Sequence, residues 1–197
     1  TIEETKAEAK KGNEDAIGNL PVALLVENAR ALHKRAEAIV KERITGFRKG
    51  TTNDPNWMHS VRVRDILLAH DFSYEVLLSG LLHDITEDGN MTLEDLAVKG
   101  FPKRVIELVD LCSHDTTVSG SEARWMKMMA RLVKANDADV WAIKLADIID
   151  NLRSSHTMPE QKQHFMKTVK AELLHRLSKP LLGDSSLWRK LDVLIGH

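Results

Sequence analysis

The sequence contains little cysteine, no long apolar run and almost no net charge. The single cysteine, Cys112, excludes an intramolecular disulfide and is typical of a reducing compartment. No apolar run approaches the ~18 residues that a membrane span requires, and the first residues lack the apolar core of a signal peptide. The net charge of −1 argues against a protein that binds nucleic acid by electrostatic attraction. We therefore expect a cytoplasmic protein that binds neither a membrane nor nucleic acid.

The alternating pattern of β-strands is also missing, and apolar residues recur with a helical period nearly everywhere. A content of 43% hydrophobic and 29% charged residues is ordinary for a globular protein. Residues 1–20, rich in Glu, Lys and Gly, predict a frayed lead-in segment, and residues 21–197 predict one all-α domain. We expect helices that begin near Pro21, His59, Ser73, Thr92, Pro102, Trp125, Ala138 and Pro159, the last of these ending near Leu177, and a final helix near Leu187.

An acidic motif, residues 83–88, directly follows the apolar run 77–82 and contains one imidazole and three carboxylates. If the preceding helix continues through the motif, Asp84, Glu87 and Asp88 lie on one face, where their like charges repel one another. A divalent cation would relieve this repulsion, and His83 beside the carboxylates suits manganese, iron or zinc better than calcium. The alternative interpretation is an ordinary acidic helix end, so a metal site requires further ligands elsewhere in the chain.

Two flanking segments supply candidate ligands. His59 lies near the start of an amphipathic helix, and Asp147 interrupts an apolar helical surface from which a lone charge would be excluded. A partly buried, hydrogen-bonded histidine is the alternative for His59. For Asp147 the alternative is a salt bridge with Lys144 or Arg153. The order of these residues along the chain provides the context that favours a metal site.

This order, a histidine, a His-Asp pair and a later aspartate, resembles the signature of the HD superfamily of metal-dependent phosphohydrolases. The extended form His-Asp-x-x-Glu-Asp is similar to the hydrolase domain of the Rel/Spo alarmone enzymes and their stand-alone small relatives. The resemblance implies a single HD-type helical bundle with the metal site in a central groove. It implies that Mn²⁺, or another divalent ion, is held by His59, His83, Asp84 and Asp147. It also implies that Glu87 and Asp88 orient and deprotonate the attacking water.

Further segments resemble the same family, over roughly residues 24–182. They are Gly46-Phe47-Arg48-Lys49-Gly50, Met91-Thr92-Leu93-Glu94-Asp95-Leu96, Lys144-Leu145-Ala146-Asp147 with Asn151-Leu152-Arg153, and Met158-Pro159-Glu160-Gln161-Lys162-Gln163. The resemblance implies that the guanidinium of Arg48 stacks on a guanine base. It implies a substrate-binding set of Arg48, Lys49, Asn151, Ser154 and Lys162. Asp150, Lys144 and Arg153 are interpreted as satisfied groups at the surface or behind the ligands.

Two departures from the family pattern affect the base pocket. The family usually has proline after its first histidine, whereas Ser60 follows His59 here. Residues 51–55 also lengthen the loop between Arg48 and His59. The metal chemistry carries over to this chain residue by residue, and the identity of the base stays open.

The resemblance therefore implies hydrolysis of the 3′-pyrophosphate of guanosine tetra- or pentaphosphate, the alarmones of the stringent response, to GDP or GTP and pyrophosphate. One alternative is an HD phosphohydrolase acting on an adenine alarmone, NADPH or a nucleoside monophosphate. Another is a nucleotide-binding HD module without turnover. The polar loop 113–121 is either a mobile cover of the site or a solvent-exposed connection. No pattern in the sequence indicates an oligomeric state.

Overall fold

The computed structural model describes residues 22–197. The chain divides into two units, residues 1–35 and 36–197, and the boundary falls within helix α2 (Val22–Arg43). The lead-in predicted for residues 1–20 and the helix start predicted at Pro21 lie outside the described residues. All the candidate site residues belong to the second unit, which is described below by itself.

The regular elements of the second unit are helices, and this confirms the predicted all-α class. Within residues 22–197 no strand forms, and the extended pairing consists of an isolated bridge between Phe47 and Pro55. The elements that follow α2 are α3 (Asn56–Leu68), α4 (Tyr74–Leu82), α5 (Leu93–Val98), α6 (Lys103–Cys112), α7 (Ser121–Ala135), α8 (Ala138–Ser154), η1 (Ser155–Thr157), α9 (Glu160–Phe165), η2 (Met166–Ala171), α10 (Glu172–Leu182) and α11 (Ser186–Ile195).

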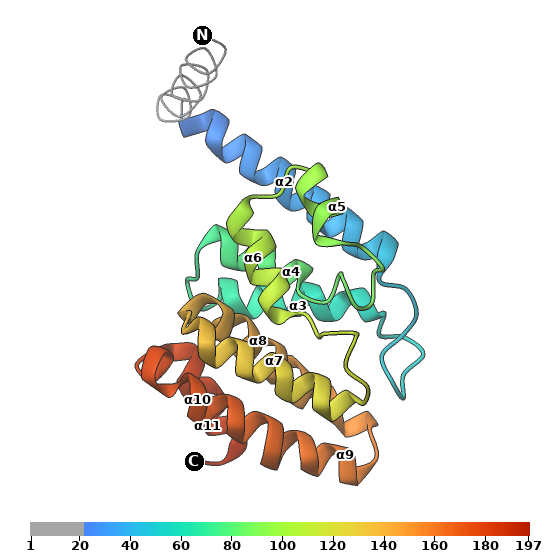
Figure 1. The fold of residues 1–197 in the computed structure, drawn as a ribbon, viewed down its shortest axis with the longest axis vertical. Helices are drawn as coiled ribbons and strands as arrows, with labels where there is room; N and C mark the ends of the chain where they lie inside the picture. Colours follow the sequence, from blue (N-terminus) through green and yellow to red (C-terminus); the bar gives the residue numbers. More distant parts are fainter. Residues whose placement is uncertain (1–21) are drawn as a thin grey trace. The chain divides into compact units, whose positions relative to one another are not determined.

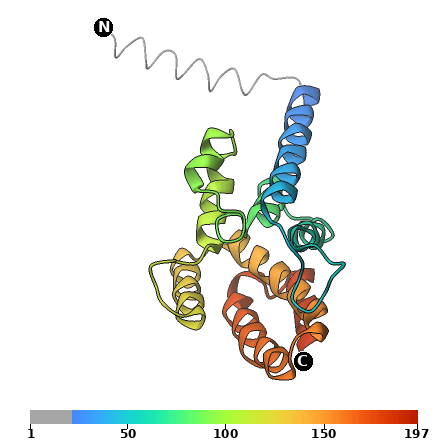
Figure 2. The ribbon, with the colours of Figure 1, turned by 90° about the vertical axis from the view of Figure 1, so that its right-hand side faces the viewer.

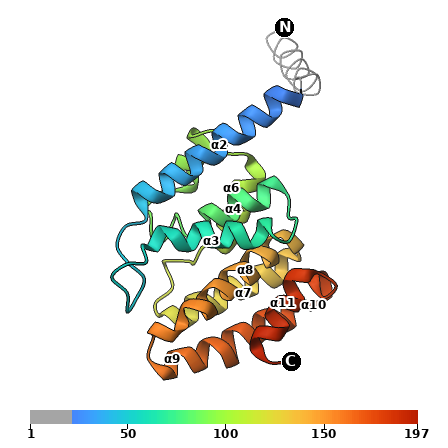
Figure 3. The same ribbon diagram turned by 180° about the vertical axis from the view of Figure 1, so that it is seen from behind.

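Helix α8 forms the centre of this unit. Its residues from Val140 to Ala146 are buried without interruption, which is typical of a helix surrounded by other elements. Helices α3 and α4 pack against one side of α8, and α10 and α11 pack against another, as Figures 1 and 3 show from opposite directions. A carboxylate at Asp147 in the middle of such a helix requires a partner that balances its charge.

Helices α3 and α4 approach each other closely at Gly80. A Cβ atom at this position would clash with Cδ1 of Leu67, a fully buried side chain of α3. The close approach leaves His83, three residues after Gly80, beside the first turn of α3, where the ring centroids of His59 and His83 are 5.2 Å apart. The packing of these two helices thus brings two predicted ligands together.

Two predicted helix starts are confirmed by their caps. The side chain of Ser73 accepts a hydrogen bond from the amide of Val76 at the start of α4. Thr92 and Asp95 form a capping box at the start of α5. These caps delimit the segment that carries the acidic motif.

The helix before the acidic motif does not continue through it, so the condition for placing the three carboxylates on one helical face is not met. Helix α4 ends at Leu82, and residues 83–88 form successive turns. The carbonyl of Gly80, which would accept from the amide of Asp84 in a continuing helix, accepts a hydrogen bond from Nδ1 of His83. The amide of Asp88 still donates to the carbonyl of Asp84 at 2.9 Å, so these two residues remain one turn apart.

The helical segment after η1 extends beyond its predicted end. Helices α9, η2 and α10 follow one another directly, with η2 in a wider π-helical form, and α10 ends at Leu182 rather than near Leu177. Pro180 lies in the last turn of α10, where it removes one amide donor close to the end of the helix. None of the helices in the described part of the chain is both long and apolar enough to cross a membrane.

Candidate functional site

Three segments of the second unit bring the four predicted metal ligands into one cluster. His59 lies in the first turn of α3, His83 and Asp84 follow α4, and Asp147 lies in α8. The ligand atoms of His59, His83 and Asp84 all lie within 4.8 Å of one another. Oδ1 of Asp147 lies 3.2 Å from Nε2 of His59 and 3.9 Å from Nε2 of His83.

Both histidines are held with Nε2 facing the carboxylates. Nδ1 of His59 lies 2.7 Å from Oδ2 of Asp150, and Nδ1 of His83 lies 2.8 Å from the carbonyl oxygen of Gly80. Both oxygens accept hydrogen bonds, so each Nδ1 carries the proton, the arrangement typical of metal-ligating histidines. Nε2 of His83 is buried and has no hydrogen-bond partner among the described residues, although Oδ2 of Asp84 is 3.1 Å away.

The charges of the cluster keep its carboxyl groups ionised. Burial alone would raise the pKa of Asp147, but the ammonium of Lys144 and the two imidazoles hold it well below its usual range. The pKa of Asp84 is also low, because the adjoining imidazole outweighs the opposing effect of burial. Burial lowers the pKa of His59, and hydrogen bonds to Asp147 and Asp150 outweigh that effect and raise it to about 9. A proton on His59 therefore balances part of the negative charge.

This arrangement fits a divalent cation. Imidazole nitrogens and ionised carboxylates face one another in the cluster, and a cation is the group that stabilises all of them together. A divalent ion would displace the proton of His59 and balance more of the charge. The mixed nitrogen and oxygen atoms suit manganese, iron or zinc. The cluster is thus a candidate metal centre, and the salt bridge between Lys144 and Asp147, the alternative interpretation of Asp147, is also present.

Glu87 and Asp88 follow the cluster in the same series of turns. The carboxylate of Glu87 accepts hydrogen bonds from the amide of His114, at 2.9 Å, and from Nδ1 of His114, at 2.7 Å. The loop after α6 therefore contacts the acidic motif. Partial desolvation and the carboxylates of Asp84 and Glu87 raise the pKa of Asp88. A carboxylate with a raised pKa is a stronger base once it is ionised.

A pocket of about 460 Å³, here called the loop pocket, adjoins the cluster; its size is in the range of small-molecule sites. It is lined by Thr45, Phe47, Arg48, Lys49, Asn56, Asp88, Asn151, Ser154, Thr157 and Met158. Nη2 of Arg48 donates to Oδ1 of Asn151 and to Oγ of Ser154, and Nδ2 of Asn151 donates to Oδ1 of Asp147. A chain of hydrogen bonds therefore leads from the pocket wall to a candidate ligand. These bonds use the edge of the guanidinium and leave its flat faces for stacking.

The loop 46–55 forms one wall of this pocket and is fixed against η1. Gly50 has φ +80°, and a Cβ atom there would lie 2.5 Å from the carbonyl oxygen of Thr157. Oγ1 of Thr157 donates to the carbonyl of Lys49 at 2.9 Å. Figure 2 shows the loop, in blue-green, reaching toward the orange segment at the end of α8. The position after Lys49 thus requires a residue without a side chain.

Four of the five predicted substrate-binding residues line the loop pocket: Arg48, Lys49, Asn151 and Ser154. The fifth, Lys162, is exposed in α9 and does not belong to the residues that line this pocket. The geometry therefore groups four of the five side chains and gives no support to a contact from Lys162.

Four residues of the site, Arg62, Asp54, Asp150 and His114, have contacts that the sequence patterns did not predict. Arg62 and Asp54 form a bidentate ion pair, and Arg62 also contacts Asp150, which is buried and bonded to His59. His114 binds Glu87 from a polar loop with no local signal. Arg62 and Asp150 each lie three residues after a predicted ligand in a helix, and this spacing on a helical face is the signal that could have found them.

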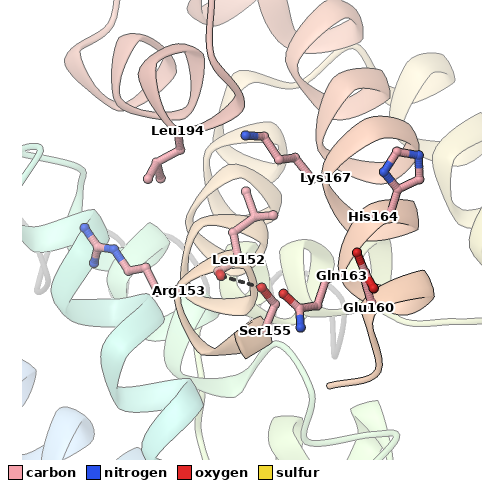
Figure 4. A pocket seen from close by; sticks show the side chains of 8 residues that line it. All are labelled: Leu152, Arg153, Ser155, Glu160, Gln163, His164, Lys167 and Leu194. Atoms are coloured by element: carbon pink, nitrogen blue, oxygen red, sulfur yellow. Dashed lines mark hydrogen bonds between the residues drawn. The ribbon is translucent and has the colours of Figure 1, made fainter. Parts of the chain in front are cut away.

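A second pocket of about 360 Å³, here called the distal pocket, lies beside the end of α8 as well. Figure 4 shows its lining residues, which are Leu152, Arg153, Ser155, Glu160, Gln163, His164, Lys167 and Leu194. Within the described part of the chain, no hydrogen bond or ion pair joins Arg153 or Lys167 to a candidate metal ligand. The basic side chains of the distal pocket are therefore not bonded to the metal cluster.

Curated relatives are similar to this chain over much of its length. A GTP pyrophosphokinase of Streptomyces coelicolor is 33% identical over 156 residues, which are 78% of this chain and 18% of that protein. A guanosine-3′,5′-bis(diphosphate) 3′-pyrophosphohydrolase of Vibrio cholerae is 33% identical over 138 residues, which are 64% of this chain and 19% of that protein. The chain thus spans about a fifth of the length of these relatives.

A solved structure and a family model agree on the fold. The structure, described as a metazoan ortholog of SpoT that hydrolyzes ppGpp, has a TM-score of 0.72 and 25% identity, and the match covers 83% of this chain and 93% of that chain. This similarity confirms the predicted HD-type helical architecture. The model of the HD domain matches residues 29–180, a range that contains the four candidate ligands and the loop pocket. The chain belongs to the HD domain family.

Proposed function

We propose that this protein is a metal-dependent hydrolase that removes the 3′-pyrophosphate from guanosine tetra- or pentaphosphate and gives GDP or GTP and pyrophosphate. The observation that carries the proposal is the position of the loop pocket directly beside the metal cluster. Asp88 lines the pocket, and Asn151 in its wall is bonded to the candidate ligand Asp147. A single substrate can therefore contact both the cluster and the pocket.

The named relatives support hydrolysis more than synthesis. They include a pyrophosphokinase and a pyrophosphohydrolase, but this chain aligns with only 18% and 19% of them, so both names describe much longer proteins. The metazoan relative is described as hydrolysing ppGpp, and this chain covers 93% of it. The activity named for the metazoan relative therefore belongs to a protein that is matched by this chain over nearly its whole length.

We further propose Mn²⁺ as the preferred ion, with His59, His83, Asp84 and Asp147 as its ligands. When bound, a divalent ion lowers the pKa of a water molecule and offsets the charge of a pyrophosphate group. The imidazole and carboxylate donors of the cluster suit manganese, and they also accept iron or zinc. Asp150 and the carbonyl of Gly80 fix the two rings through Nδ1, so that each Nε2 would be available to hold the ion.

Glu87 and Asp88 form the proposed acid-base pair. The raised pKa of Asp88 suits it to accept the proton of the attacking water. Glu87, which two hydrogen bonds from His114 hold in place, would orient that water. The attack on phosphorus breaks the bond to the nucleoside 3′-oxygen, and that oxygen leaves with the nucleotide product.

The nucleoside would occupy the loop pocket. The face of the Arg48 guanidinium is suited to stacking on a purine, Lys49 offers a charge to a phosphate, and Asn151 and Ser154 offer polar groups to a ribose or phosphate. Lys162 is retained as a substrate contact on the family resemblance alone. Phe47, whose exposed fraction is 55%, belongs to the same wall and to the loop 46–55, which residues 51–55 lengthen. This loop favours a second candidate function, the same metal chemistry on a nucleotide with another base.

We also propose a cytoplasmic location. The single cysteine, Cys112, is a free and buried thiol. A chain with no use for disulfides is typical of a reducing compartment.

Product analysis with a panel of nucleotides tests the proposal. The purified protein with Mn²⁺ is expected to release pyrophosphate from guanosine tetraphosphate faster than from adenine alarmones, NADPH or nucleoside monophosphates. Release of orthophosphate, or a better substrate in the panel, would favour the second candidate function. Nucleotide binding without turnover of any compound in the panel would identify a binding module.

A further inference from the structure

One arginine connects the loop 46–55 with the metal cluster. Arg62 lies in α3, three residues after His59, and its Nη1 and Nη2 donate to the two carboxylate oxygens of Asp54 at 2.9 and 3.2 Å. Its Nε donates to Oδ1 of Asp150 at 2.7 Å. The other oxygen of Asp150, Oδ2, lies 2.7 Å from Nδ1 of His59. A single guanidinium therefore joins the loop, through one carboxylate, to the ring of a candidate ligand.

The contact on the side of the metal cluster determines how the carboxylate of Asp150 is held. Asp150 is only 2% exposed, and a buried carboxylate must have its charge balanced. His59 and Arg62 are the side chains that balance it, one on each oxygen. Removing Arg62 frees one oxygen and lets the carboxylate plane rotate, and the His59 ring that it orients would rotate with it.

The contact on the side of the loop extends to the pocket wall. The backbone carbonyl of Asp54 accepts the amide of Arg48 at 2.9 Å, so Asp54 links Arg62 to the residue whose guanidinium lines the loop pocket. The side chains of Arg62 and Asp54 are 31% and 28% exposed, and an isolated pair of this exposure contributes little to stability. A bidentate geometry fixes orientation as well, and this is its main effect here.

The loop thus reaches both sides of the cluster. Arg48 connects it to Asp147 through the amide of Asn151, and Asp54 connects it to His59 through Arg62 and Asp150. We propose that Arg62 is a positioning residue that sets the pocket loop and the metal-binding ring of His59 at the same time, so that nucleotide affinity and metal affinity both depend on it. The nucleotide half of this inference rests on the proposed function, and the metal half does not.

Calorimetric titration of Mn²⁺ into the metal-free protein tests the metal half. Arg62→Met is expected to weaken Mn²⁺ binding about tenfold, the usual scale for a partner behind a metal ligand. Arg104→Met is the matched control, because Arg104 also donates to two aspartates, Asp137 and Asp139, at the opposite end of α8. Equal Mn²⁺ affinities in the two variants would overturn the proposal, since both lose one guanidinium shared by two carboxylates.

Steady-state kinetics with guanosine tetraphosphate tests the nucleotide half. Asp54→Asn is expected to raise KM by about three- to tenfold. It should change Mn²⁺ affinity by less than about twofold, because the side chain of Asp54 contacts Arg62 and no candidate metal ligand. In the Arg62→Met protein the same change should add nothing further, since the contact is already lost. Independent, multiplicative effects of the two changes on KM would contradict the coupling.

Arg62→Lys keeps the proposal testable if Arg62→Met does not fold. A single ammonium retains the charge but cannot reproduce the fork that reaches both aspartates, so either Mn²⁺ affinity or KM must deteriorate. Wild-type values of both quantities would overturn the inference. A wild-type protein that leaves guanosine tetraphosphate intact would refute the proposed function alone, because the Mn²⁺ comparison with Arg104→Met still decides the metal half.

Discussion

The end of helix α8 lines two pockets, and their difference lies in their contacts rather than in their size. The loop pocket and the distal pocket have volumes of about 460 and 360 Å³, and both contain basic side chains. In the loop pocket, hydrogen bonds lead from Arg48 through Asn151 to Asp147. For the distal pocket, no such connection exists among the described residues. Connection to the cluster therefore distinguishes the candidate substrate pocket, and volume and charge do not.

The comparison depends first on the cluster itself, so the largest expected effect is that of Asp84→Ala. Removal of this carboxylate leaves both imidazoles without one of their partners and should abolish measurable Mn²⁺ binding and lower turnover on the order of 10³-fold or more. Calorimetry and a pyrophosphate-release assay measure the two effects. Asp110→Ala, at a surface carboxylate paired with Arg131, should leave both unchanged. Normal turnover in Asp84→Ala would place the chemistry elsewhere, and the distal pocket would then become a candidate.

The next effect separates catalysis from metal binding, at the two acidic residues that follow the cluster. Glu87→Ala combined with Asp88→Ala should lower turnover by about 10²- to 10⁴-fold, because the proposed general base is lost. Mn²⁺ affinity should change by only a few fold, since neither residue is a proposed ligand. Of the single changes, Asp88→Asn should lower turnover more than Glu87→Gln. The raised pKa of Asp88 suits it to act as the base, whereas Glu87 is bound to His114. Turnover that persists in the double variant would remove both residues from the mechanism.

A smaller effect is expected in the wall that joins the pocket to the cluster. Arg48→Ala should raise KM about tenfold, through loss of a stacking cation worth ~1–2 kcal/mol. Arg48→Lys should not restore KM, because an ammonium has no flat face and cannot bridge Asn151 and Ser154 as the guanidinium does. Substrate-dependence curves measure KM for each variant. An unchanged KM in Arg48→Ala would mean that the base does not contact this wall.

The sequence is sufficient to predict the helical class, the caps at Ser73 and Thr92, and the family to which the chain belongs. Each of these depends on local spacing or on an ordered motif. Asp147 could also be identified from the sequence, because it is a charged residue within an apolar helical surface. The roles of the ligands and of the acid pair stay predictions that the geometry supports. The measurements described above test them directly.

Contacts between distant segments could not be predicted in the same way. The carboxylate of Glu87 and His114 are 27 residues apart, and Arg62 and Asp150 are 88 residues apart, so no local period indicates either pair. The end of α4 at Leu82 also escaped prediction, because a histidine side chain competes for a backbone carbonyl that the apolar pattern assigns to the helix. These contacts form only when α3, α4 and α8 pack together.

The smallest expected effect is in the distal pocket, and it is the control for the whole comparison. Lys167 and Arg153 are exposed and have no bond to the cluster within residues 22–197, so Lys167→Ala and Arg153→Ala should change kcat/KM by less than about twofold and the free energy of unfolding by less than about 0.5 kcal/mol. Turnover assays and urea denaturation measure these quantities beside Arg48→Ala. If Lys167→Ala raised KM as much as Arg48→Ala, a basic pocket near α8 would suffice to bind the substrate, and the connection through Asn151 to Asp147 would no longer distinguish the two pockets.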